Sequence, residues 1–425
     1  MIVPPQILWM LERLRATITE RDVTERLKRR DAGLPAPLRP IRHATAETLD
    51  GLWLRLGAGN LAAERAAIAD PDSVRDAEIY SANIENFIGT VKVPVGVIGP
   101  VRVNGLHAHG DYFIPMATTE AALVASYGRG AEVVSRAGGA SVALLGEGVL
   151  RSPGFLFEGL VQSGLFVEWV ARTVDDLKRT AEATTRYGKL VSLEPVIDND
   201  IVFLLCRYTT GDASGQNMVT IATEALCRFI EANSPVKPRR WFVEANFSGD
   251  KKASHLGMLT GRGRKASASV VVPADIVRSL LHTDIDAMLE YGRVANLGAL
   301  LAGQLGAQAH YANGLAAFYI ATGQDAACVS ESAVGFTRME ARDGGLFVSA
   351  TLPNILVGSV GGGTGLPSQS AALRIMGLAG DGKAAALAEL VAVLCLCGEI
   401  SIVAALAAGH FARAHRKLAR LRKPR

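Results

Sequence analysis

The pattern of apolar and polar positions changes along the chain and divides it into regions. Residues 1–75 are rich in Arg, Ala and Leu, which predicts helices and a linker. Within residues 91–100, Gly and Pro punctuate β-branched residues, which predicts short strands and turns. A helical pattern follows over residues 117–134, and Thr118 or Thr119 is its expected N-cap.

The second half of the chain carries two further patterns. Residues 153–243 alternate apolar runs, such as 201–205, with helical segments, such as 217–232, and this alternation predicts an α+β module. Beyond residue 251 the chain is rich in Ala and Gly, so we expect helices that approach one another closely. Three consecutive glycines, residues 361–363, interrupt this region and predict a flexible loop.

The most apolar stretch, residues 384–411, has the length of a membrane span. A spanning helix needs about 20 predominantly apolar residues, whereas Glu389 and Glu399 interrupt this one. We therefore expect a long helix buried by protein. Residues 1–13 lack a basic segment followed by an apolar core, so we expect no signal peptide and a cytoplasmic protein.

Composition narrows the classes of function. The chain has 425 residues, of which 49% are hydrophobic and 20% are charged, as is typical of a globular protein of two or three domains. The net charge of +4 is too small to indicate a nucleic-acid partner. The five cysteines lack the spacing of a zinc site or a redox pair, so we expect reduced thiols and no metal.

Candidate chemistry begins at residues 248–252, where two adjacent lysines follow an aspartate. Like charges repel, and Lys is rarely buried without a partner, so packing explains this pair of lysines poorly. A solvated turn is the alternative. Further polar groups at residues 118–120, at residues 323–325 and at His415 favour a functional site.

Two glycine-containing segments could bind phosphate groups. Residues 211–218 place small residues before a helix, whose free N–H groups and positive dipole end attract anions. A capping turn is the alternative, and the triple glycine has the same ambiguity. Residues 57–62 match the dinucleotide fingerprint G-x-G-x-x-A, but no buried strand precedes them, so we reject that interpretation.

The basic C-terminal segment contains two histidines. His410 and His415 are five positions apart, so they do not share a helical face, and this argues against a joint metal site. The neighbouring cations Arg413, Arg416 and Lys417 favour the neutral form of His415 and suit it to proton transfer. A structural histidine is the alternative.

Taken together, these segments resemble the HMG-CoA reductases (3-hydroxy-3-methylglutaryl-CoA reductases) from about residue 85 to residue 420. The matching motifs are residues 85–89, 94–97, 117–120, 211–218, 250–252, 323–327, 360–364 and 406–410. The resemblance implies an α+β fold with a large, helix-rich α/β substrate domain, an inserted small ferredoxin-like cofactor domain and a helical N-terminal region. The implied domains are 1–84 (helical), 85–152 with 253–425 (CoA and substrate), 153–242 (NADPH) and 243–252 (catalytic loop).

The resemblance implies an oxidoreductase that uses NADPH to reduce HMG-CoA to mevalonate and CoA, a four-electron step of isoprenoid biosynthesis. Lys251 matches the cation beside the negative oxygen that develops after each hydride arrives. Glu120 matches the proton donor to the aldehyde, and Asp325 matches the carboxylate that joins Lys251 and Glu120 in one network. His415 matches the histidine that protonates the CoA thiolate.

The family's binding residues are carried over position by position. Substrate contacts match Arg151, Lys252, Asn313, Ser126 and Arg129, and nicotinamide-cofactor contacts match Arg186, Asp212, Asn217, Gly361, Gly362, Gly363 and Thr364. An arginine at position 186 suits a 2′-phosphate, which favours NADPH over NADH. The family also implies a homodimer, or a homotetramer of two dimers, with sites between subunits.

Three parts of the chain depart from the family pattern. Ser214 and Gln216 lie in the cofactor motif, which usually reads Asp-Ala-Met-Gly-Met-Asn-Met. Glu244 stands where the catalytic loop often has a serine, and Ala295 stands where the family has a lysine, for which Arg293 could substitute. A related reductase of a different acyl-CoA thioester is therefore an alternative. A non-catalytic CoA- or nucleotide-binding protein is a third hypothesis, against which the four matched catalytic residues argue.

Overall fold

The computed structural model describes residues 5–17, 19, 25, 28, 37–57 and 60–409. The chain forms two compact units, Met1–Thr90 and Val91–Arg425.

The first unit is helical, as the composition predicts. Its helices are α1 (Pro5–Thr17), α3 (Ala46–Leu56), α4 (Ala62–Ile68), α5 (Pro71–Arg75) and α6 (Ala77–Ser81). Leu49, Trp53 and Phe87 form part of its small core, and the Trp53 indole donates a 2.9 Å hydrogen bond to the carbonyl of Ile88. Gly57 ends α3 in the left-handed conformation, with φ at 97°. A helix C-cap therefore accounts for this glycine, in line with the rejected dinucleotide fingerprint.

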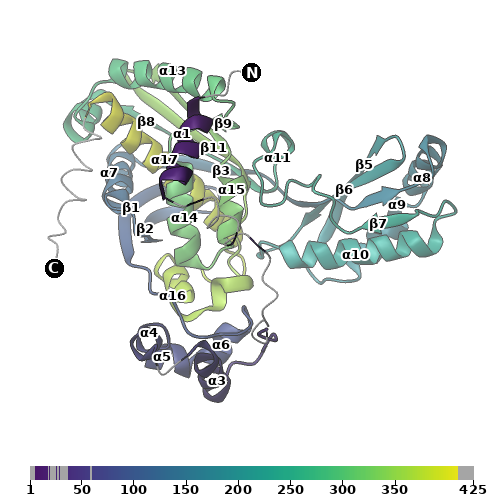
Figure 1. Ribbon diagram of the computed structural model, residues 1–425. Helices are drawn as coiled ribbons and strands as arrows, with labels where there is room; N and C mark the ends of the chain where they lie inside the picture. Colours follow the sequence, from purple (N-terminus) through teal and green to yellow (C-terminus); the bar gives the residue numbers. More distant parts are fainter. Residues whose placement is uncertain are drawn as a thin grey trace. The chain divides into compact units, whose positions relative to one another are not determined.

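A large mixed sheet forms the body of the second unit (Figure 1). Its strands, in spatial order, are β2 (His109–Ala117), β1 (Val95–Gly105), β3 (Ala140–Arg151), β8 (Gly263–Pro273), β11 (Gly345–Ile355), β10 (Gly335–Arg342) and β9 (Gly306–Ala307). The strands from β3 to β10 pair antiparallel, whereas β1 pairs parallel with β3. The sheet therefore joins segments that lie far apart in the sequence, since Ser269 pairs with both Ser141 and Ser349.

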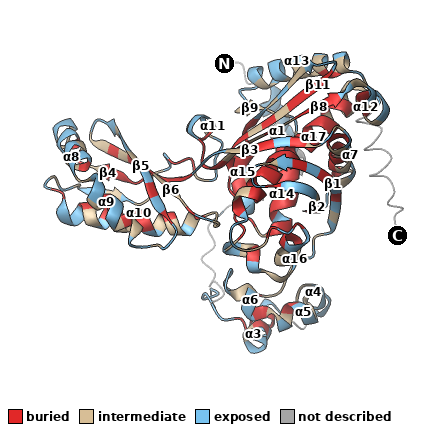
Figure 2. Ribbon diagram, turned by 180° about the vertical axis from the view of Figure 1, so that it is seen from behind, coloured by how far each residue is buried: buried red, intermediate tan, exposed pale blue. Residues whose placement is uncertain are grey.

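Helices connect and cover the strands of this sheet, and the longest of them packs against β3, β8 and β11. They are α7 (Leu123–Arg136), α11 (His255–Thr260), α12 (Ala274–Ile276), η1 (Val277–Leu281), α13 (Ile285–Leu301), α14 (Tyr311–Thr322), η2 (Ala326–Cys328), α15 (Val329–Ser332), η3 (Gly362–Gly365), α16 (Pro367–Ile375) and α17 (Ala384–Ala407). In the part of the chain that the structure describes, α17 is the one helix long and apolar enough to span a membrane, but 78% of its most apolar window is buried in the fold (Figure 2). The buried core helix expected over this stretch is thus present.

A smaller antiparallel sheet extends from the end of β3. Its elements are β4 (Gly154–Leu156), α8 (Leu160–Arg172), α9 (Val174–Glu182), β5 (Lys189–Asp198), β6 (Ile201–Thr209), α10 (Gln216–Asn233) and β7 (Arg240–Phe242). The strand order β7-β4-β6-β5 and the order of elements βαββαβ are ferredoxin-like, so the predicted fold class is confirmed. The last residues of β3 pair with β6, from Val149↔Tyr208 to Arg151↔Cys206. One continuous strand therefore joins the two sheets at Arg151.

One local prediction was wrong. The helix expected from residue 117 begins at Leu123, and neither Thr118 nor Thr119 is its N-cap. Thr118 Oγ1 instead accepts a hydrogen bond from the N–H of Glu120, and Ala122 precedes the helix with φ at 69°. Local side-chain hydrogen bonding of this kind competes with helix formation. The region beyond residue 251 is rich in helices, as expected, and it also contains the strands β8, β10 and β11.

Candidate active site

The loop that follows β7 carries the two adjacent lysines and has an unusual backbone. Asn246, Gly249 and Lys251 all have φ between 58° and 69°, in the left-handed region. Non-glycine residues rarely adopt this conformation, so neighbouring groups must hold the loop in place. Ser248 Oγ donates to Glu244 within the loop at 2.9 Å.

Lys251 faces Asp325 across this loop. The Lys251 ammonium lies 2.8 Å from Asp325 Oδ2, and each side chain is 41% exposed. Asp325 follows the C-terminal turn of α14 and caps η2, where its carboxylate accepts from the N–H of Ala327 at 3.0 Å. The hydrogen bond to Asp325 raises the pKa of Lys251, so the pair presents a firmly cationic ammonium toward solvent.

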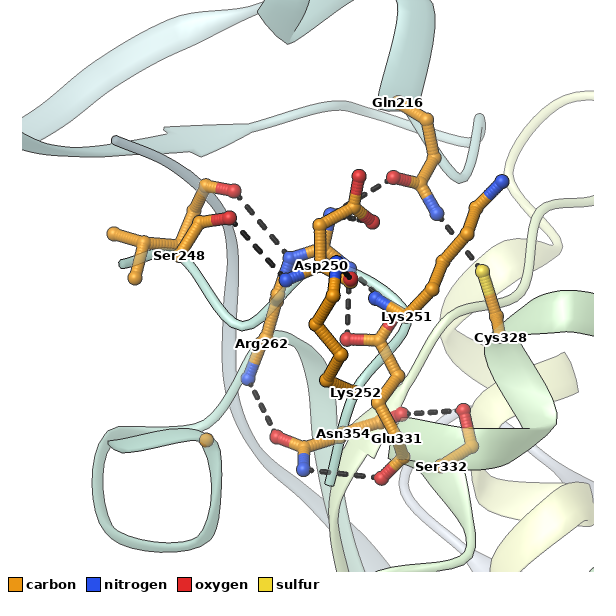
Figure 3. A network of polar contacts seen from close by, with 12 residues as sticks. Gln216, Ser248, Asp250, Lys251, Lys252, Arg262, Cys328, Glu331, Ser332 and Asn354 are labelled. Atoms are coloured by element: carbon orange, nitrogen blue, oxygen red, sulfur yellow. Dashed lines mark hydrogen bonds and ion pairs between the residues drawn. The ribbon is translucent and has the colours of Figure 1, made fainter. Parts of the chain in front are cut away.

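Ion pairs of the buried Arg262 lie beside Lys251 (Figure 3). Arg262 and Glu331 are each 1% exposed, and Arg262 Nη1 lies 2.6 and 2.7 Å from the two oxygens of Glu331. Arg262 Nη2 also lies 2.8 Å from Asp250. Burial works to raise the pKa of Asp250, but Arg262 and Arg151 outweigh it and lower that pKa. Asp250 is therefore an ionised bridge between two arginines.

The two residues matched to the substrate carboxylate lie at this loop. Arg151 is 5% exposed, and its Nη1 lies 3.2 Å from Glu244 and 3.0 Å from Asp250. Lys252 is exposed, and its ammonium donates to the carbonyl of Asp250 at 2.9 Å. The structure therefore gathers Lys251, Lys252 and Arg151 around Asp250.

Three of the residues matched to the cofactor lie at or near the turn that precedes α10. Asn217 is exposed on the first turn of α10, and Arg186 is exposed in the turn before β5. A Cβ on Gly211 would lie 3.5 Å from Tyr187, so the Arg186 turn lies against the glycine turn that begins the cofactor motif. Asp212 accepts from the N–H groups of Gly382 (2.7 Å) and Ala384 (3.1 Å), and thus fixes the start of α17.

The loop Gly361 to Thr364, called the glycine loop below, packs directly against the turn that carries Asp325. A Cβ on Gly323 would lie 2.2 Å from the carbonyl oxygen of Gly363, so only glycine fits at position 323. The side chain of Gln324 accepts from the N–H of Gly358 at 2.8 Å and donates to its carbonyl at 3.0 Å. Gly361 and Gly362 face open space, which suits the close approach of a phosphate or ring to the backbone.

A second group of predicted residues lines a cavity of about 1020 Å³ between α7, α13 and α17. Glu120 accepts from the side-chain amide of Asn313 at 2.8 Å at one side of it. Arg129 donates to the carbonyl oxygen of Ser401 at 2.7 Å, and the hydroxyls of Ser126 and Ser401 are 3.0 Å apart. Ala295 and Arg293 also line this cavity, and Arg293 points its guanidinium toward Glu290 at 3.5 Å.

The two groups are separated by the length of α14. Asn313 is the third residue of this helix and Asp325 lies three residues beyond its end. At 1.5 Å per residue, they are on the order of 15 Å apart along the helix axis. Within one chain, Glu120 therefore does not join the network of Lys251 and Asp325 that the resemblance implies.

Arg262 and Glu331 were not expected at the site from the sequence, because single charges among small residues give no sign of burial. His410 and His415 lie outside the described residues. In the described ranges, no group of three or more His, Cys, Asp or Glu side chains could hold a metal ion.

Gln216 links the two sheets at this site. Its Oε1 accepts from Arg262 at 2.8 Å, and its Nε2 lies 2.9 Å from the sulfur of Cys328. Burial raises the pKa of the Cys328 thiol, so this cysteine is a protonated packing group rather than a nucleophile.

Comparisons with known proteins identify the family of the chain. A family model described as hydroxymethylglutaryl-coenzyme A reductase matches residues 58–420. The 3-hydroxy-3-methylglutaryl-coenzyme A reductase of Methanothermobacter thermautotrophicus is 44% identical over 340 residues, 80% of this chain and 85% of that protein. The enzyme of the same name from Aeropyrum pernix is 42% identical over 349 residues, 81% and 83% of the two chains.

A solved structure shares the fold at lower identity. It is the class II 3-hydroxy-3-methylglutaryl-CoA reductase of Streptococcus pneumoniae bound to NADPH in open conformations, with a TM-score of 0.63 and 20% identity over 82% of this chain and 85% of that one. The match of the family model spans most of the chain and includes both groups of site residues. This chain therefore belongs to the hydroxymethylglutaryl-coenzyme A reductase family of oxidoreductases, and it reduces HMG-CoA to mevalonate with a nicotinamide cofactor.

Proposed function

We propose that this reaction uses NADPH and that Lys251, Asp325 and Glu120 perform its charge and proton chemistry. The observation that carries the proposal is the 2.8 Å pair of Lys251 and Asp325, which lies beside the glycine loop. The nicotinamide cofactor would supply one hydride each time it is bound, so the four-electron reduction would use two cofactor molecules in turn. Each hydride leaves a negative oxygen on the substrate carbon, and the Lys251 ammonium stabilises that oxygen.

Asp325 and Asn313 orient the two reacting groups. Asp325 keeps Lys251 charged and directs its ammonium, as the raised pKa of Lys251 supports. Asn313 donates to Glu120 and thereby leaves the other carboxyl oxygen of Glu120 for the aldehyde oxygen, to which Glu120 gives a proton. His415 protonates the departing CoA thiolate in this account, since a thiolate left free would attack the aldehyde again.

Substrate and cofactor occupy separate surfaces in the proposal. The cavity beside Arg129 and Ser126 takes the CoA portion of the substrate, and Arg151 with Lys252 pairs with the free carboxylate. Asp212, Asn217 and the loop Gly361 to Thr364 hold the nicotinamide nucleotide. Arg186 is exposed and free to approach a 2′-phosphate dianion, which supports NADPH over NADH.

We further propose that the working unit is a homodimer, or a tetramer of two dimers, in the cytoplasm. The separation of Glu120 from Lys251 supports this, because a second copy can bring one group of residues to the other. We also propose the domain division expected from the sequence, with domains at residues 1–84, 85–152 with 253–425, 153–242 and 243–252.

A direct assay tests the proposed cofactor and residues. NADPH and NADH oxidation are followed with HMG-CoA and with simpler acyl-CoA thioesters, for the unaltered protein and for Lys251→Met. We expect turnover with HMG-CoA and NADPH, and a loss of about 100-fold or more in kcat for Lys251→Met. Unchanged kcat in Lys251→Met would remove this lysine from the mechanism.

A second candidate is activity on a different acyl-CoA thioester. The specific observation in its favour is that Arg151 already forms ion pairs with both Glu244 and Asp250, so its positive charge has partners without a substrate carboxylate. Ala295 in the cavity wall also offers no cation to a substrate carboxylate. The same assay separates the candidates, because this one requires faster turnover of a thioester that lacks the carboxylate.

A further inference from the structure

The backbone of Lys251 is held at both of its peptide groups. Its N–H donates to Glu331 Oε1 at 3.0 Å, and its carbonyl accepts from Ser330 Oγ at 2.6 Å. Lys251 has φ at 58°, a conformation that a lysine does not favour by itself. These two contacts compensate for the strain where the side chain turns toward Asp325.

All three contacts of Lys251 come from one short segment. Asp325 binds the ammonium, while Ser330 and Glu331 of α15 bind the peptide groups, only five and six residues later. The direction of the ammonium is therefore fixed relative to its carboxylate partner. The half-exposed side chain of Lys251 therefore has a well-defined position, because the Lys251 backbone is bonded to the same segment that carries Asp325.

Glu331 is itself fixed from beneath (Figure 3). Arg262 binds both of its oxygens and also pairs with Asp250, the residue before Lys251. The side chain of Asn354 binds the carbonyl of Glu331 at 3.2 Å and the N–H of Arg262 at 2.8 Å, which ties α15 to β11. Through Glu331, the buried contacts of Arg262 and Asn354 therefore hold the backbone of the exposed Lys251.

We propose that Glu331, held by Arg262, is a positioning residue for catalysis, because its carboxylate keeps the Lys251 backbone in the conformation that aims the ammonium at the reacting oxygen. The inference rests on the proposed function of Lys251. Glu331 does not touch the substrate. Its effect passes through Lys251, so its loss changes kcat and leaves substrate affinity nearly unchanged.

The principal variant is Glu331→Gln. The substitution keeps the shape of the side chain but replaces one carboxylate oxygen by an N–H donor, which faces the donors of Arg262 and Lys251. We expect kcat to fall about 10- to 100-fold, as small misplacements of a reacting group do, with KM for HMG-CoA within about threefold of the unaltered value. Ser330→Ala removes the other backbone contact at an exposed hydroxyl and should lower kcat several-fold without unfolding the chain.

The matched control is Glu389→Gln. Glu389 is also fully buried and also accepts from backbone N–H groups, those of His107, Ala108 and Leu144, but it contacts nothing at Lys251. Each kcat is divided by the folded fraction, which circular dichroism measures. A purely structural role predicts that Glu331→Gln, like Glu389→Gln, keeps kcat per folded molecule whatever stability it loses.

A double-mutant cycle separates this inference from the proposed function. If Lys251→Met keeps full kcat, the proposed role of Lys251 fails. If Lys251→Met is inactive while Glu331→Gln and Ser330→Ala match the control in kcat, the inference alone is overturned. The expected result is that Lys251→Met with Glu331→Gln loses no more activity than Lys251→Met, since both act through one group.

Discussion

Glu244 Oε2 lies 3.2 Å from Arg151 Nη1, at a site where Asp250 already pairs with the same nitrogen at 3.0 Å. Two carboxylates thus compete with any substrate carboxylate for one buried guanidinium. Glu244 also accepts from the N–H of Ser152 and the hydroxyl of Ser248, so it ties the start of the catalytic loop to the residue after β3 and to the middle of the loop. The departure from the family pattern at position 244 therefore has a definite structural partner.

Replacing Glu244 by Ser should strengthen binding of HMG-CoA. Arg151 would then pair with Asp250 alone and have one carboxylate fewer competing with the substrate carboxylate, so we expect KM to fall roughly 3- to 10-fold. Steady-state kinetics with HMG-CoA provide the measurement, and Ser248→Ala is the control because it removes a hydrogen bond to Glu244 without changing charge. A higher KM in Glu244→Ser would mean that Arg151 does not bind the substrate.

Gln216 should matter for both stability and cofactor binding. Gln216→Met removes hydrogen bonds to Arg262 and Cys328 and leaves a buried arginine donor without its acceptor, at a cost of about 1–3 kcal/mol. Because Gln216 begins α10, beside Asn217, KM for the cofactor should rise as well. Urea denaturation and cofactor titration test the two effects, and Thr220→Val, on the next turn of α10, is the control. Unchanged stability would show that the link between the sheets is weak.

The pH dependence of kcat should depend on Asp325. Because Asp325 raises the pKa of Lys251 above its ordinary 10.5, the pair stabilises the fold fully below about pH 10.5. This stabilisation is lost as pH rises through the higher folded pKa. In Asp325→Asn, the alkaline fall of kcat should therefore begin at lower pH. Profiles from pH 8 to 11 for this variant and for the exposed Asp275→Asn test the expectation, and identical alkaline limbs would contradict it.

Arg186 should discriminate between the two nicotinamide cofactors. Arg186→Ala removes the exposed guanidinium proposed to bind the 2′-phosphate, so KM for NADPH should rise about tenfold or more while KM for NADH stays the same. Arg179→Ala is the matched control, since Arg179 is an exposed arginine on α9 that pairs with Asp176. Equal effects on both cofactors, or on both variants, would remove Arg186 from cofactor recognition.

The sequence indicated the candidate reacting groups Lys251 and Asp325, but it did not indicate the buried residues that contact them. Lys251 and Asp325 stand in recognisable motifs, whereas Glu331 and Arg262 are single charges whose burial depends on strands far apart in the chain. The strand β8 was not predicted. Ala and Ser alternate along residues 266–269, and because both side chains are small, this alternation is a weak signal of a strand. The start of α7 was misplaced because Thr118 bonds locally to Glu120 rather than to a helix.

The separation of Glu120 from Lys251 could not be predicted either. Motif order along the chain says nothing about which residues lie at opposite ends of α14. A linear match implied one network of Glu120, Lys251 and Asp325, while the fold divides it into two groups on the order of 15 Å apart.

Mixing two inactive variants tests the central claim most directly. Glu120→Gln and Lys251→Met are purified separately, mixed, unfolded, refolded together and assayed with HMG-CoA and NADPH. If Glu120 of one subunit acts with Lys251 of another, random pairing leaves one intact site in each hybrid dimer, and activity should return to about a quarter of the unaltered value. No recovery, in a mixture shown to contain hybrid dimers, would contradict a site completed by a second copy of the chain.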